Sequence, residues 1–121
     1  MQEGLEKLVS VDSIIGFLDE CVRHKRVLSP GQWLDAAQKL NVLLSDEHER
    51  LYDLEHQVAT LRLQLLNGQE KINVSEVRIR IEASEIYKQS KIQKAKIGRI
   101  EELIRIAKRQ ASLKESEWKG Y

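Results

Sequence analysis

Cysteine, proline and aromatic residues are scarce in this chain of 121 residues. The single cysteine, Cys21, cannot form a disulfide within the chain, so nothing in the sequence favours an oxidising compartment. Aromatic residues make up 5% of the chain and there is one proline, whereas leucine, isoleucine, lysine, glutamate, glutamine and alanine are abundant. Because strands favour β-branched and aromatic residues while helices favour this other set, the composition predicts an all-α fold.

Long apolar runs are also missing. The longest, IIGFL at residues 14–18, has about five residues, whereas a helix needs about 20 apolar residues to cross a bilayer. The first residues, MQEGLEKL, are polar and acidic, unlike a cleavable signal peptide. We therefore expect a cytoplasmic protein that does not associate with membranes.

The residue groupings that support catalysis or metal binding are few. Three histidines are scattered and the six glycines are all isolated, so neither a catalytic group nor a phosphate-binding loop can be named. Glu49, Asp53 and His56 share one helical face, but helical-bundle metal sites take ligands from several helices and only one such motif is present. Cys21 and His24 lack the second pair that a tetrahedral zinc site needs. We expect no enzyme, no metal and no cofactor.

Charge is unevenly distributed, although the net charge is only +1. From Glu76 onward the chain holds twelve Lys and Arg against seven Glu, which gives +5. The first 75 residues hold eight bases against twelve acids, which gives −4. This pattern favours pairing within or between chains at least as much as binding of an anionic ligand.

Helix signals divide the chain into a helical pair at residues 1–45 and a coiled-coil hairpin at residues 46–121. In the pair, a first helix runs from residue 12 or 13 to about residue 26, and a second from Pro30 to Leu44. The second has a clear start, since Ser29 and Gln32 form a capping-box pattern around a proline at the first helical position.

The hairpin is predicted to contain helices at about 46–66 and 75–117. A start signal, Ser-Asp-Glu at 45–47, opens the first of them and Asn67-Gly68 ends it. Between these signals, apolar residues follow the 3-4-3-4 spacing of a coiled-coil seam: Leu51, Leu54, Val58, Leu61 and Leu65.

The long C-terminal helix is predicted to be unbroken and to carry two apolar stripes, one of which includes Ile79, Ile86, Ile97, Ile100 and Ile104. At about 1.5 Å per residue this helix is twice as long as the one before it, so half of its apolar surface needs another neighbour. Either the first two helices fold back onto it or a second copy of the chain packs there. Because exposed stripes of this length are rare on monomers, we favour a homo-oligomer, most simply a dimer. Its candidate interface consists of these isoleucines and of the seam residues Leu51, Leu54, Val58, Leu61 and Leu65.

A row of basic residues with one tyrosine occupies another face of the same predicted helix: Arg80, Tyr87, Lys91, Lys94, Arg105 and Arg109. Such a row could follow a phosphate backbone, with the tyrosine as a stacking surface for a base. The simpler interpretation is the solvated side of a coiled coil, because Glu76 with Arg80 and Glu101 with Arg105 are ordinary i, i+4 pairs. The sequence leaves both interpretations open.

Trp118, in the tail ESEWKGY, is a candidate docking residue because tryptophan is over-represented at binding hot spots. The alternative is that its ring folds back onto its own subunit.

The segments SPGQWLDAAQKLNVLL and KAKIGRIEELIRIAKRQ resemble the small helical accessory proteins of tailed bacteriophages. Such proteins act as assembly factors, as inhibitors of host or defence enzymes, or as helpers in replication and recombination. The resemblance implies no catalytic residue. With the helical patterns, it leads us to expect a non-catalytic protein-binding accessory protein that self-associates through its long helix; the alternative is an accessory protein that binds nucleic acid through the basic row.

Overall fold

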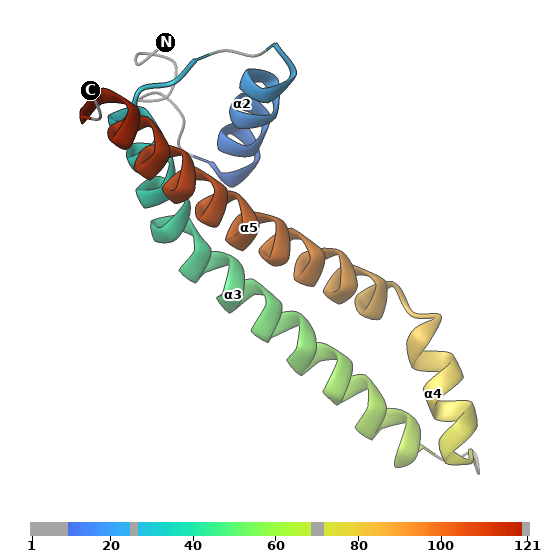
Figure 1. Ribbon diagram of the computed structural model, residues 1–121. Helices are drawn as coiled ribbons and strands as arrows, with labels where there is room; N and C mark the ends of the chain where they lie inside the picture. The colour runs from blue at the N-terminus through green and yellow to red at the C-terminus, as the bar shows by residue number, and fades with distance from the viewer. Residues whose placement is uncertain (1–9, 25–26, 69–71, 120–121) are drawn as a thin grey trace. The chain divides into compact units, whose positions relative to one another are not determined.

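The computed structural model describes residues 10–24, 27–68 and 72–119, without the side chains of Val22 and of residues 114–119. These residues form α-helices and no strand, which confirms the all-α class. The helices are α2 (Val11–Arg23), α3 (Pro30–Leu66), α4 (Val74–Glu82) and α5 (Glu85–Lys119) (Figure 1).

Side-chain caps fix where α2 and α3 begin. Before α2, the Ser10 hydroxyl oxygen accepts a hydrogen bond from the Ser13 backbone N–H at 3.1 Å. Before α3, the predicted capping box is confirmed: the Ser29 hydroxyl oxygen accepts from the Gln32 N–H at 3.2 Å, and the Gln32 side-chain oxygen accepts from the Ser29 N–H at 2.9 Å. These bonds satisfy backbone donors that have no partner within the helix.

The predicted helix boundary at residues 45–47 is wrong, because α3 runs without interruption from Pro30 to Leu66. Ser45 and Asp46 resemble a helix start, but each costs less than about 0.7 kcal/mol in a helix interior relative to alanine. No glycine or proline follows Gly31 until Gly68, so nothing ends the helix between them. Local start signals are therefore outweighed by the continuity of the hydrogen-bonded backbone.

The predicted unbroken helix at 75–117 is also wrong, since Ala83 and Ser84 separate α4 from α5. The Ser84 N–H donates to the Ile81 carbonyl at 2.9 Å, three residues back, which ends the regular ladder of α4. The Ser84 hydroxyl donates to the same carbonyl at 2.6 Å and accepts from the Tyr87 N–H at 3.2 Å. Ser84 thus satisfies the end of one helix and the start of the next, which is the behaviour that makes serine favourable at caps.

Two compact units make up the fold, and the first combines α2, the part of α3 up to Ser45, and the part of α5 from Gly98. Their shared core contains these buried residues: Val11, Ile14, Leu18, Cys21, Leu28, Trp33, Ala36, Ala37, Leu40, Ile100, Leu103, Ile104, Ala107 and Ala111. The alanines on α3 and α5 let the two helices approach closely. An ion pair at the surface joins Arg99 of α5 to Asp19 of α2 at 2.6 Å.

The second unit, residues 46–97, contains the rest of α3, all of α4 and the first part of α5. Leu54, Val77, Ile81 and Ile97 are buried here. Gln93 is only 5% exposed, and its amide donates to the Glu47 carbonyl oxygen at 2.9 Å and to the Glu47 carboxylate at 2.7 Å. A buried amide is tolerated at this position because both of its donor hydrogens find an acceptor.

Candidate interaction surfaces

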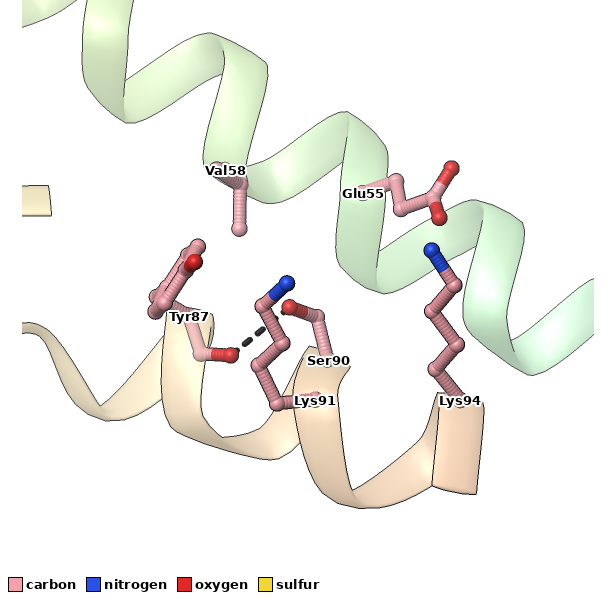
Figure 2. A pocket seen from close by; sticks show the side chains of 6 residues that line it. All are labelled: Glu55, Val58, Tyr87, Ser90, Lys91 and Lys94. Carbon is pink, nitrogen blue, oxygen red and sulfur yellow. Dashed lines mark hydrogen bonds between the residues drawn. The ribbon is translucent and has the colours of Figure 1, made fainter. Parts of the chain in front are cut away.

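A small surface cavity lies between α3 and α5 in the second unit, and part of the predicted basic row lines it. Its walls are formed by Glu55, Val58, Tyr87, Ser90, Lys91 and Lys94 (Figure 2). Its volume, about 160 Å³, is below the ~300 Å³ at which pockets begin to enclose a drug-sized ligand. This cavity suits contact with one group of a larger molecule.

Tyr87, Lys91 and Lys94 form what we call the Tyr87 cluster. The Lys91 ammonium lies 5.2 Å from the centre of the Tyr87 ring, within the range of a cation–π contact. The Ser90 hydroxyl donates to the Tyr87 carbonyl at 2.7 Å. Figure 2 shows the Lys94 side chain pointing toward the Glu55 carboxylate. One acidic residue of the cavity wall therefore lies beside the two lysines of the cluster.

The rest of the predicted basic row is divided among other elements. Arg80 belongs to α4, whereas Tyr87 belongs to α5. The prediction that both lie on one face assumed a single continuous helix, which the structure does not have. Arg105 and Arg109 are exposed on the part of α5 that belongs to the first unit. The structure therefore groups three of the six predicted residues.

Most of the predicted oligomer interface lies within the fold of a single chain. Ile97, Ile100 and Ile104 of α5 are buried, as is Leu54 of α3. The other predicted interface residues on the inward faces of α3 and α5 are half-buried: Leu51, Val58, Leu61, Leu65 and Ile86. Ile79, on α4, is 65% exposed. In the first unit, α2 and α3 cover Ile100 and Ile104, so the apolar character of these two residues is explained without a second copy.

Trp118 lies in the last part of α5, and its side chain is outside the described residues.

The residues considered as metal ligands, Glu49, Asp53 and His56, are exposed on α3. Within the described part of the chain, no three histidine, cysteine, aspartate or glutamate side chains come together in a way that could hold a metal ion.

A second apolar stripe runs along α3 and was not predicted from the sequence. It consists of Tyr52, His56, Ala59, Leu63 and Leu66, all exposed, and we call it the outer stripe. Tyr52 is 74% exposed, Leu63 60% and Leu66 47%. At 100° per residue, the outer stripe lies roughly 150° around the helix from the seam that includes Leu54, which faces inward.

The signal for the outer stripe is present in the sequence as a 4-3-4-3 spacing from residue 52 to residue 66. It is less evident than the inner seam because a histidine and an alanine occupy two of its five positions. Knowing which face of α3 packs inward reveals that Tyr52, Leu63 and Leu66 lie together on the opposite, exposed face.

None of the described helices combines the length and the apolar character that crossing a bilayer requires. Comparisons of the chain with protein-family models, with curated proteins and with solved structures find no match.

Proposed function

We propose that this chain is a non-catalytic helical binding protein, acting as an adaptor, inhibitor or assembly factor, and that the outer stripe of α3 is its protein-binding face. The observation that carries the proposal is the exposure of Tyr52, Leu63 and Leu66 along one side of a single helix. An amphipathic helix that presents apolar residues at this spacing is a common way to bind another helix or a groove. Exposed apolar side chains in a continuous row are typical of interaction sites.

Other features fit the same class of protein. The resemblance of two segments to small accessory proteins of tailed bacteriophages favours a binding role, and the lone, buried Cys21 fits a reducing, cytoplasmic setting.

A capture experiment with two matched variants tests this function. Leu63 and Ile92 are both 60% exposed, but only Leu63 belongs to the outer stripe. Tagged wild type, Leu63→Glu and Ile92→Glu proteins are used to capture proteins from the cells that produce this chain, followed by mass spectrometry. We expect a protein that wild type and Ile92→Glu retain and that Leu63→Glu loses. If all three variants retain the same proteins, the outer stripe is not the binding face.

A second candidate function is binding of a nucleic-acid backbone by the Tyr87 cluster. The observation that favours it is the convergence of two lysines and one aromatic ring on a single cavity. Phosphate contacts of this kind are weakened by salt, and a tyrosine face can stack on any base. Glu55, in the same cavity, opposes it.

Fluorescence polarisation with a labelled single-stranded oligonucleotide at about 50 mM salt tests this candidate. We expect the double variant Lys91→Glu/Lys94→Glu to lose binding and the control Lys108→Glu, on an exposed part of the first unit, to retain it. Absence of binding by the wild type at this salt concentration would refute the candidate.

A further inference from the structure

The outer stripe has a defined period and defined flanks, which narrow the choice of partner. Its residues repeat at the 3.5-residue average of a coiled-coil seam, and the same register extends back by one position to the exposed Glu49. The stripe therefore spans about two and a half heptads. A surface with this period is complementary to another helix of the same period.

We infer that the partner is a second copy of this chain, and that the two α3 helices pair antiparallel through the outer stripe. This inference rests on the proposed function and assigns an occupant to the same face. In the antiparallel register, Tyr52 packs against the partner's Leu63, and His56 packs against the partner's Ala59. The His56 imidazole then fits in the layer where the opposing side chain is small. Leu66 meets the aliphatic stem of the partner's Glu49 at the rim.

Charge complementarity selects this arrangement. Glu55 and Arg62 both lie on the flank of the outer stripe that immediately precedes its seam positions. This flank borders the inward face of α3, so the Glu55 carboxylate also lies near Lys94 of its own chain (Figure 2). In an antiparallel pair these flanking positions face each other, so Glu55 meets the partner's Arg62. Because the contact is two-fold symmetric, the pair forms twice. On the opposite flank Asp53 meets the partner's Thr60, which brings no like charges together.

A parallel pair lacks these contacts. In that arrangement Glu55 would face the partner's Thr60 and Arg62 the partner's Asn67, so neither charge would gain an opposite one. The two Tyr52 rings would also share one layer, as would the two His56 rings. The sequence on the flanks thus fits a second copy in one orientation.

The contact is short, so the dimer is expected to be reversible. A standard stable interface buries about 800 Å² per partner, and a helix pair of two and a half heptads falls below this value. We expect a dissociation constant on the order of 10 to 100 μM.

Charge reversal tests both the occupant and the orientation, with oligomeric state measured by sedimentation equilibrium over about 1 to 500 μM protein. The variants Glu55→Arg and Arg62→Glu each convert two attractive pairs into two repulsive ones, and we expect each to weaken the wild-type dimer about tenfold. The double variant Glu55→Arg/Arg62→Glu restores both pairs with their signs exchanged. We expect its dissociation constant to return to within about threefold of wild type.

Two further variants complete the test. Leu63→Glu should be monomeric throughout, and Ile92→Glu should dimerise like wild type; circular dichroism verifies that every variant keeps its helix content. A wild type that is monomeric at all concentrations overturns the inference, as does a double variant no stronger than the single ones. If the wild type is monomeric while Leu63→Glu still loses a captured protein, the homodimer is refuted and the proposed function stands.

Discussion

Replacing Ile100 with alanine should lower the free energy of unfolding of the first compact unit by more than a comparable substitution on the surface of α5. Ile100 is completely buried, in a core built from α2, α3 and α5. The substitution removes three carbon atoms, whose transfer out of water is worth about 0.8 kcal/mol each, or about 2.4 kcal/mol together. The cavity left behind adds about 1 kcal/mol, because neighbouring side chains relax only in part.

The matched control is Ile92→Ala on the same helix, where the side chain is 60% exposed. There the loss of burial is about 1 kcal/mol, and the higher helix propensity of alanine offsets about 0.4 kcal/mol of it. The same propensity gain applies at Ile100, so the expected contrast is about 3 kcal/mol at Ile100 against about 0.5 kcal/mol at Ile92. A small domain is stable by about 5 to 15 kcal/mol, so the first change removes a large share of the total.

Urea unfolding followed by circular dichroism measures the contrast. With an m-value of about 1.5 kcal/mol/M, Ile100→Ala should lower the midpoint by roughly 2 M and Ile92→Ala by less than about 0.5 M. Repeating the pair in a Leu63→Glu background removes any contribution from self-association. Because Ile100 is covered by its own chain, the shift should not depend on protein concentration. Equal shifts for the two variants, or a shift that grows on dilution, would refute this packing.

Two further predictions concern hydrogen bonds. Gln93→Ala leaves the Glu47 carboxylate and carbonyl without the buried amide that bonds both, and should lower the free energy of unfolding by about 1 to 3 kcal/mol in the same urea assay; an unchanged midpoint would contradict the contact. Ser29→Ala removes the hydroxyl that accepts from the Gln32 N–H and should cost about 1 kcal/mol, whereas Ser29→Thr, which keeps a hydroxyl, should cost less. Equal effects of the two Ser29 substitutions would argue against a capping role.

Some of the fold can be predicted from the sequence because the signals are local. The Ser29–Gln32 capping box is an example: both hydrogen bonds join residues three apart, so their spacing alone indicates them. The composition likewise indicates the all-α class. The apolar seam through Leu54 indicates which face of α3 turns inward, since its period matches that of a helix.

Other features depend on competition between signals. Ser45 and Ser84 are both serines near acidic residues in helical sequence, yet only Ser84 interrupts a helix. Nothing in the local sequence distinguishes them. The predicted basic row failed as a unit for the same reason, since the helix break at Ala83 and Ser84 separates Arg80 from Tyr87.

The apolar period of the long helix also does not indicate which segment packs against it. An isoleucine stripe indicates that a neighbour exists, but it does not say whether the neighbour comes from the same chain. In this protein α2 and the beginning of α3 pack on Ile100 and Ile104.

The amide of Gln93 gives the second unit a property that its apolar residues cannot provide. Leucine and isoleucine side chains on facing helices would tolerate a slide of one turn, about 5.4 Å, because each would meet another aliphatic group. The amide would not, since a slide removes it from the one carboxylate that meets it and leaves its hydrogens enclosed in hydrocarbon. A single buried glutamine thus fixes one alignment of α3 against α5 within the second unit.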